Sequence, residues 1–241
     1  MLRVVSWNVG RVYSPSSNNR LRDEDIPQIT AALGGLVPDV VLLQELVEAA
    51  QLATLLSAMP DYDGQMSLAC RYDRHAAVLA RRALRPAFED TELAPTGRGF
   101  PTVTFDVPGG VGARGAASAV HLDAFSETGR RSQAEALSTL GELRAEPVQV
   151  IGGDFNLDPR YASTLDVGTF ALLAARYREP RPLNSDVGTL MALWRVDHVL
   201  ARGPLCGALR SEVARGFRLP MGDHDPLICD VETVSISLPS R

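Results

Sequence analysis

The residues of this chain with the clearest chemical potential are Asp154 and Asn156, which follow the segment from Val150 to Gly153. On a β-strand, residues two positions apart point to the same side, so we expect the carboxylate and the carboxamide to emerge together at a strand end. The glycines before them allow a ligand to approach the backbone closely. Such a pair suits a site for a charged, oxygen-rich group, although Gly and Asp also mark ordinary turns.

Other expected strands also end in polar residues of catalytic type. The strand 2–8 ends at Asn8, the run 40–45 ends at Glu45, and the strand 118–122 contains His121. Two later segments contain Asp197 with His198, and Asp223 with His224 and Asp225. Any one of these could be a strand that enters a polar loop, but the whole set is hard to explain in that way. We therefore expect one shared cleft, formed by Asn8, Glu45, His121, Asp154, Asn156, Asp197, Asp223 and His224. His198 directly follows Asp197, so it points to the opposite side and we expect it to pack.

Strands and helices alternate along the chain. We expect strands at 2–8, 39–45, 65–70, 76–81, 85–90, 101–107, 114–121, 147–152, 195–201, 208–215 and 226–236. Helices are expected at about 23–36, 47–58, 129–144 and 168–176, where apolar residues recur with helical spacing or caps are present. No shift in composition marks a boundary, so we expect one domain over residues 1–241.

The composition is that of a globular protein without a membrane span. Hydrophobic residues make up 45% of the 241 residues, and no apolar run approaches the ~20 residues needed to cross a bilayer. The chain begins with an expected core strand, which leaves no room for a cleavable leader. Its three cysteines are widely spaced, which favours neither a disulfide framework nor a zinc site. We expect a cytoplasmic monomer without stable membrane association.

The charge balance gives no sign of a dedicated duplex-binding surface. The formal net charge is −5, and every Lys or Arg position is arginine. Proteins that bind duplex nucleic acid usually show a basic footprint, and the net charge of this chain shows none. Nucleic acid is therefore kept only as one candidate partner among the phosphate esters. Arg98 lies in the expected loop 96–99, where it either contacts a phosphate or is simply solvated.

Six short segments carry a resemblance to a known family. In chain order they are Trp7-Asn8, Leu43 to Glu45, His121-Leu122, Gly153 to Asn156, Arg195 to His198, and Asp223 to Pro226. Together they resemble the endonuclease/exonuclease/phosphatase superfamily, which includes pancreatic deoxyribonuclease-type nucleases, AP endonucleases, neutral sphingomyelinases and inositol polyphosphate 5-phosphatases. The first segment begins at residue 7 and the last ends at residue 226, so the resemblance extends over nearly the whole chain. The resemblance implies an α/β fold, a four-layer α/β/β/α sandwich of two mixed β-sheets flanked by helices, with the site at one end.

The resemblance also implies a metal-dependent hydrolase of phosphate esters, most simply a phosphodiesterase or nuclease. Glu45 is then the direct metal ligand, with Asn8 nearby and Asp223 completing the shell. Hard oxygen ligands of this kind suit Mg²⁺, and Mn²⁺ should substitute.

The same resemblance implies roles in proton transfer. His224 is the expected general base, held by Asp197, because a carboxylate on one ring nitrogen fixes the tautomer and stabilises the imidazolium. His121 would donate to a phosphoryl oxygen, and Asn156 would orient the nucleophile or stabilise charge. Asp154 would handle the proton of the nucleophile or of the leaving group.

The substrate is not specified by these residues, because a fold supports many activities. His121 stands where AP endonucleases typically carry tyrosine, and the exposed apolar insertions typical of sphingomyelinase-like members are not apparent. The alternatives are a metal-dependent phosphomonoesterase acting on a small molecule or lipid headgroup, and a binding module that keeps the fold without the chemistry. Loss of Glu45, Asp154 or His224 would mark such a module, and all three are present.

Overall fold

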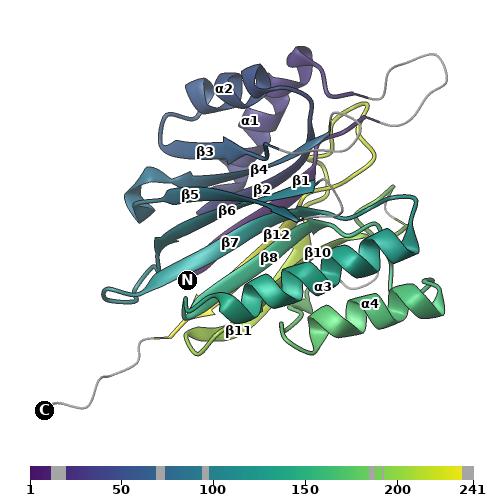
Figure 1. Ribbon diagram of the computed structural model, residues 1–241. Coiled ribbons are helices and arrows are strands. Elements are labelled where there is room, and N and C mark those ends of the chain that lie inside the picture. The colour runs from purple at the N-terminus through teal and green to yellow at the C-terminus, as the bar shows by residue number, and fades with distance from the viewer. Residues whose placement is uncertain (12–19, 69–73, 94–97, 185–187, 192, 235–241) are drawn as a thin grey trace, which may run out of the picture.

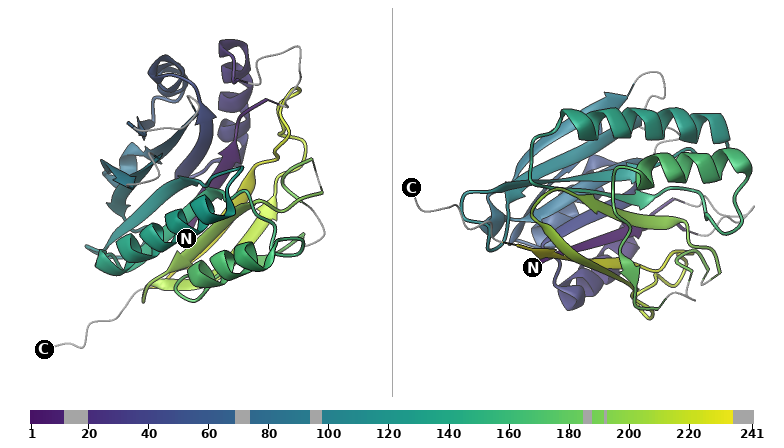
Figure 2. Two further views of the ribbon diagram at one scale, coloured as in Figure 1. Left: turned by 45° about the vertical axis from the view of Figure 1, so that its right-hand side comes forward. Right: turned by 90° about the horizontal axis from the view of Figure 1, so that it is seen from below.

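Two β-sheets pack face to face, and helices cover both outer surfaces (Figure 1). This computed structural model describes residues 1–11, 20–68, 74–93, 98–184, 188–191 and 193–234. Helices α1 (Ile26–Leu36) and α2 (Ala49–Ala58) cover one sheet, and α3 (Glu127–Leu143) and α4 (Thr164–Ala174) cover the other (Figure 2). The expected α/β/β/α sandwich is therefore confirmed. No helix of the described part of the chain is long and apolar enough to span a bilayer.

Both sheets are mixed. The first has the order β3-β4-β2-β1-β12-β11-β9, with β1 parallel to β2. Its strands are β1 (Leu2–Asn8), β2 (Val40–Leu46), β3 (Tyr62–Met66), β4 (His75–Arg81), β9 (Arg181–Pro182), β11 (Cys206–Val213) and β12 (Leu227–Thr233). The second has the order β10-β8-β7-β6-β5, with β7 parallel to β8. Its strands are β5 (Ala87–Leu93), β6 (Arg98–Asp106), β7 (Arg114–His121), β8 (Val148–Asp154) and β10 (Asp197–Arg202).

Strands such as β2 and β8 are apolar and buried on both faces, because the other sheet covers one face and helices cover the other. In β1, Leu2 and Val4 belong to the cluster between the sheets, whereas Val5 and Trp7 belong to the cluster under α1 and α2. A third cluster fills the space between the second sheet and helices α3 and α4. The alternation follows from the two-residue period of a strand. It decides which side of each sheet receives the polar residue at the strand end.

Element ends differ from the sequence-based expectation where a local cap decides them. Helix α4 begins four residues before the expected residue 168, because the Ser163 side chain accepts a hydrogen bond from the Asp166 amide at 3.2 Å. The two-residue strand β9 was not expected, since its pairing partner β11 is distant in sequence. Residues 69–70 and 235–236, expected to be in strands, lie outside the described residues.

Candidate active site

Three acidic or imidazole side chains occupy the same rung of the second sheet. His121 of β7 pairs in register with Asp154 of β8, and Asp154 pairs with Asp197 of β10. Along β10, Val199 and Ala201 face the space between the sheets, so the strand period places Asp197 on that same side. All three side chains are buried. The sheet register therefore assembles three of the eight expected residues at one end of the sandwich.

The backbone of β8 can form this rung only because it lacks side chains just before Asp154. A Cβ atom placed on Gly153 would lie 1.7 Å from the Val120 carbonyl oxygen of β7. Gly153 also has a positive φ of 153°, which residues with a side chain rarely adopt. Gly153, one of the glycines just before Asp154 in the sequence, is thus required for the close approach of β7 and β8.

Asn8 joins the two sheets at this end. Its side chain lies on the inter-sheet side of β1, and its amide donates to Asp154 Oδ2 at 2.9 Å and to Glu45 Oε1 at 3.3 Å. Its oxygen accepts from the Gly10 amide at 2.9 Å, which fixes the orientation of the carboxamide. Asn8 therefore connects the carboxylates of two different strands.

Glu45 reaches the cluster through an irregularity in β2. Leu43 faces helices α1 and α2, so the strand period alone would send Glu45 to the same helix side. Instead, the pairing of β2 with β4 shifts between Leu43 and Leu46, and Glu45 has a left-handed φ of 69°. Such a bulge re-aims a side chain, here toward Asn8. The left-handed backbone of a non-glycine residue is costly and is typical of functional sites.

Two further residues contact Glu45 and were not among the expected site residues. Arg74, just before β4, donates from Nη1 to Glu45 Oε2. A Cβ atom on Gly10 would lie 2.1 Å from the same carboxylate oxygen, so glycine is required there. Arg74 ends no apolar strand and belongs to none of the six motif segments, so the sequence did not mark it as a site residue. The signal that it belongs here is its place before β4, the antiparallel neighbour of the strand that carries Glu45.

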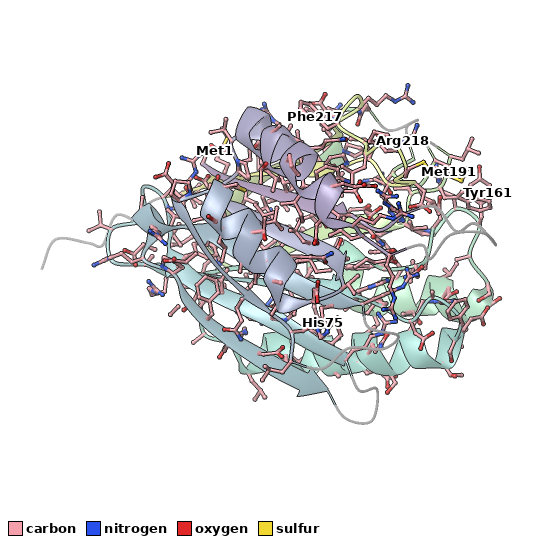
Figure 3. The ribbon with its side chains drawn as sticks, turned by 90° about the horizontal axis from the view of Figure 1, so that it is seen from above. Met1, His75, Tyr161, Met191, Phe217 and Arg218 are labelled. Atoms are coloured by element: carbon pink, nitrogen blue, oxygen red, sulfur yellow. The ribbon has the colours of Figure 1, made fainter. Side chains whose placement is uncertain are left out.

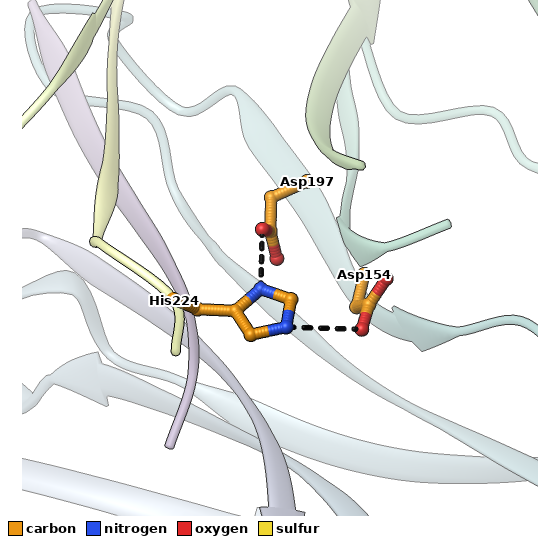
Figure 4. A group of neighbouring side chains, drawn as sticks. All are labelled: Asp154, Asp197 and His224. Atoms are coloured by element: carbon orange, nitrogen blue, oxygen red, sulfur yellow. Dashed lines mark hydrogen bonds and ion pairs between the residues drawn. The ribbon is translucent and has the colours of Figure 1, made fainter. Parts of the chain in front are cut away.

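His224 reaches the cluster from the loop before β12. The Trp7 indole donates to the His224 carbonyl oxygen at 3.2 Å, which anchors this loop to β1. The ring places Nδ1 2.7 Å from Asp197 Oδ2 and Nε2 3.8 Å from Asp154 Oδ2 (Figure 4). One nitrogen is therefore held by a carboxylate, and the other faces a second carboxylate.

The protonation of this group follows from burial and from its neighbouring charges. Burial opposes a charged ring, but the charge and hydrogen bond of Asp197, with Asp154 and Asp223 nearby, outweigh it and raise the pKa of His224 to about 10. Burial and the charge of Asp197 raise the pKa of Asp154 to about 7, against the opposing charge of His224. Between these two values, an imidazolium faces a carboxylate.

His121 is in the opposite state. Burial, together with the positive charges of Arg98 and Arg74, holds its pKa well below the ordinary value, so the ring is neutral near pH 7. Its Nε2 lies 3.8 Å from Asp154 Oδ2 and 4.0 Å from Glu45 Oε1. A neutral ring at this position can donate one N–H to an anionic group.

Arg98 is not a loop residue as expected. It begins β6, is 5% exposed, and donates from Nη1 to the His121 carbonyl oxygen at 2.8 Å. The pairing of β5 with β6 extends to the pair of Leu93 and Arg98, so strand structure includes this position. Nη1 of Arg98 thus contacts the backbone under His121, and its expected contact with a phosphate stays a prediction.

Asn156 has a left-handed φ of 51° and is tied to the cluster by its backbone and its side chain. Its amide donates to Asp154 Oδ1 at 2.8 Å, and its Nδ2 donates to the Leu122 carbonyl oxygen at 3.0 Å. Both carboxylate oxygens of Asp154 therefore have a donor, since Oδ2 accepts from Asn8. This arrangement orients Asp154 toward His224.

Glu45, Asp223 and Asn8 offer the oxygen donors that a hard divalent cation requires. Burial and the charge of Glu45 raise the pKa of Asp223, so a cation beside the two carboxylates would relieve their repulsion. Asp154, Asp197 and His224 also place ligand atoms within 4.8 Å of one another. In that group, however, His224 Nδ1 and Asp197 are already hydrogen-bonded to each other. The first set fits Mg²⁺ or Mn²⁺ better, because these ions prefer oxygen to imidazole.

His198 packs in the core, as expected from its position next to Asp197. Its ring lies between Phe155 and Phe170, with centroid distances of 5.2 and 4.8 Å. Its Nε2 lies 3.2 Å from the Leu157 carbonyl oxygen. It points away from the cluster and takes no part in it.

Comparisons with known proteins identify related folds. The family model described as "Endonuclease/Exonuclease/phosphatase family" matches residues 5–217. No curated protein sequence matches the chain. Among solved structures, the chain is similar to an endonuclease/exonuclease/phosphatase from Bacteroides vulgatus, with 17% identity, a TM-score of 0.75, and coverage of 97% of this chain and 99% of that one.

Two further structures are similar at comparable levels. Truncated Caenorhabditis elegans TDP2 has 14% identity and a TM-score of 0.71, with 96% of this chain and 98% of that chain covered. The mannosyl-6-phosphatase Bt3783 of Bacteroides thetaiotaomicron VPI-5482 has 16% identity and a TM-score of 0.70, with 96% and 99% covered. At these identities the likeness concerns the fold alone.

Proposed function

The chain belongs to the endonuclease/exonuclease/phosphatase family, and from this we propose that it is a divalent-metal-dependent hydrolase of phosphate diesters. The family membership confirms the resemblance inferred from the sequence motifs. The observation that carries the proposal is the position of His224, held by Asp197 on one nitrogen and facing Asp154 with the other. The oxygen donors of Glu45 and Asp223 stand beside this group.

Hydrolysis requires an acceptor for the proton of the attacking water. His224 and Asp154 lie 3.8 Å apart, and their titrations are linked because each stabilises the charged form of the other. We assign the proton transfer to this pair as one unit, because strongly interacting groups titrate together. Asp197 fixes the tautomer of the ring and stabilises its charged form. Asn8 and Asn156 orient Asp154 toward it.

The phosphoryl group requires charge stabilisation as its oxygens become more negative. A divalent ion held by Glu45 and Asp223 would supply positive charge to those oxygens and to the leaving group. The neutral His121 ring is placed to donate a hydrogen bond to a phosphoryl oxygen, since its Nε2 faces the same space between Glu45 and Asp154.

Electrostatics favours a diester over a monoester. The site brings together four carboxylates, namely Glu45, Asp154, Asp197 and Asp223, against the cationic side chains of Arg74, Arg98 and His224. A phosphate monoester carries about −1.5 to −2 charges at pH 7, whereas a diester carries one fewer ionisable oxygen. Before a cation binds, the carboxylates outnumber the cationic side chains, so the ion-free site disfavours the second negative charge of a monoester. Nucleic acid is one such diester.

A panel of esters tests the proposal. We expect the protein to cleave bis-p-nitrophenyl phosphate faster than p-nitrophenyl phosphate when Mg²⁺ or Mn²⁺ is present, and to lose activity in EDTA. His224→Ala should remove this activity, because the coupled pair that takes the proton of the water is then incomplete. Faster cleavage of the monoester would indicate a phosphatase. Full turnover in chelator would contradict the metal requirement, and the absence of turnover on every ester, single- and double-stranded DNA included, would favour a binding module.

A further inference from the structure

A groove opens beside the catalytic cluster and has no part in the chemistry described above. It encloses about 290 Å³, and its lining includes Asn156, Asp158, Tyr161, Ser163, Trp194 and Val196. Asn156 belongs to both sites, because its amide is bonded to Asp154. A group attached to a phosphate at the cluster would therefore extend directly into the groove.

Two exposed aromatic rings form one side of this groove. Tyr161 is 67% exposed and Trp194 is 44% exposed, although such rings are usually largely buried. Their centroids lie 5.3 Å apart and their planes meet at 72°, so one ring meets the other edge to face. Figure 3 shows Tyr161 at the outer edge of the molecule, at the same end as Met191. Met191 is itself bonded through its amide to the Asp223 carbonyl oxygen.

The rings are held by a buried carboxylate. Asp158 is 5% exposed and accepts hydrogen bonds from the Arg195 amide at 2.7 Å and from Arg160 Nη2 at 2.6 Å. The Arg160 guanidinium lies 5.4 Å from the centroid of the Tyr161 ring and also donates to the Leu193 carbonyl oxygen at 3.2 Å. Asp158 and Arg160 thus fix the backbone on either side of Trp194 and support Tyr161. The aromatic surface is arranged before any ligand binds.

The chemistry of the lining favours a flat ligand with polar edges. Asn156 and Ser163 are neutral hydrogen-bonding residues, and the charge of Asp158 is neutralised by Arg160. Two other carboxylates line the groove: Asp166 is neutralised by a buried ion pair with Arg130 at 2.6 Å, and Glu127 is exposed and its charge also acts on Arg130. An aromatic surface with neutral polar groups at its edge suits a heteroaromatic ring better than an acyl chain or a sugar.

We propose that this groove binds a nucleobase attached to the phosphate that is cleaved, with the base stacked on Trp194 and in contact with Tyr161. The part of this statement that concerns the cleaved phosphate rests on the proposed function, and the binding of the base does not. Stacking of a base on an aromatic side chain depends on its π-face and not on its identity, so we expect all four bases to bind.

Tryptophan fluorescence provides a test that needs neither metal nor turnover. The chain has two tryptophans, and Trp7 is 1% exposed, so Trp194 is the one that can report a ligand in solution. In EDTA, adenosine 5′-monophosphate should quench the fluorescence with saturation, whereas ribose 5-phosphate should not. Tyr161→Ala should weaken the binding of adenosine 5′-monophosphate by about 5- to 150-fold, the range for loss of one stacking partner. Phe217→Ala, which changes another exposed aromatic residue, should leave it unchanged.

Three results would overturn the proposal. They are the absence of saturable quenching by adenosine 5′-monophosphate, equal binding of ribose 5-phosphate, and stronger binding of dihexanoyl phosphatidate, which would mark a lipid site. Trp194→Phe removes the signal but keeps a ring, so calorimetry on this variant should show adenosine 5′-monophosphate binding within about tenfold of wild type. Loss of that binding, in a variant that unfolds at the wild-type temperature, would argue against stacking.

Measurements of kcat/KM on two esters test whether the groove takes part in the reaction. Thymidine 5′-(p-nitrophenyl phosphate) and methyl p-nitrophenyl phosphate share a leaving group, but the first carries a nucleoside where the second carries only a methyl group. We expect Trp194→Ala to lower kcat/KM for the thymidine ester by at least tenfold and to leave the methyl ester within threefold. If neither ester is cleaved while adenosine 5′-monophosphate binds, the proposed function fails and the base site stands. Equal loss on both esters would overturn the assignment of the groove.

Discussion

The substitution Asp197→Asn isolates the effect of one buried charge on His224. The two side chains are almost fully buried and their nearest atoms lie 2.7 Å apart. Two unit charges about 4 Å apart interact by about 4 kcal/mol at an effective dielectric constant near 20. Since one pKa unit corresponds to about 1.4 kcal/mol, the loss of this charge should lower the pKa of His224 by about three units. The pKa of about 10 would then fall to about 7.

Asp197→Asn should also change how the free energy of unfolding depends on pH. In the ion-free protein the folded-state pKa of His224 lies above the ordinary unfolded value of about 6.5, so the folded state binds more protons between these values. The stabilisation is therefore complete below about pH 6.5 and is lost as the pH rises through about 10. In Asp197→Asn the pH-dependent part of the stability should be small, and it should be lost between the unfolded pKa of about 6.5 and the new folded pKa of about 7. Turnover should fall by about 10²–10⁴ because the wrong tautomer is favoured.

Two measurements check this reasoning. Side-chain NMR of the four histidines gives the pKa of His224 directly, and urea unfolding in EDTA across pH 6 to 10, about the range between the two pKa values, gives the change in stability. Asp63→Asn, in an exposed ion pair with Arg82, is the control and should alter neither result. A shift of His224 by less than about one pKa unit would refute the view that Asp197 raises its pKa through charge.

Three other substitutions test the surroundings of the cluster. Arg74→Ala should tighten Mn²⁺ binding by about tenfold in calorimetry, because a positive charge leaves Glu45; weaker binding would show that Arg74 positions Glu45 instead. Gly10→Ala should weaken Mn²⁺ binding by at least about tenfold with little change in Tm, since the new Cβ would displace Glu45; unchanged binding would contradict this. Arg130→Ala should lower the free energy of unfolding by about 3–5 kcal/mol in urea titrations, because Asp166 would remain buried without its partner; a loss below about 1 kcal/mol would contradict the importance of the pair.

The rung of His121, Asp154 and Asp197 could be predicted from sequence, because the side on which each residue lies depends only on the strand that carries it. Each residue ends or begins an apolar strand, and the two-residue period places it on a definite side. The convergence of such strand ends followed from the family resemblance. The layer architecture followed from the same resemblance.

Other features depend on contacts between distant segments and were beyond prediction. The bulge that turns Glu45 toward Asn8 depends on the pairing of β2 with β4, and the period of β2 alone would send the side chain to the helices. Arg98 was expected in a loop because glycines flank it, yet its pairing with Leu93 makes it part of β6. The role of Arg74 emerges only when β4 is placed beside β2. Strand register and side-chain reach across sheets are set by tertiary structure.

The pairing of β1 with β12 has a consequence for how the protein becomes active after synthesis. Leu2 pairs with Val231, and Trp7 holds the loop of His224, so the centre of the first sheet joins segments from opposite ends of the chain. Contacts of such long sequence separation form slowly, because a large loop must close before they contribute. The chain is made from its N-terminus, so β1 must wait without its partner until β12 has emerged. Ester hydrolysis should therefore begin only after translation has passed β12, and a nascent chain stalled earlier should be inactive.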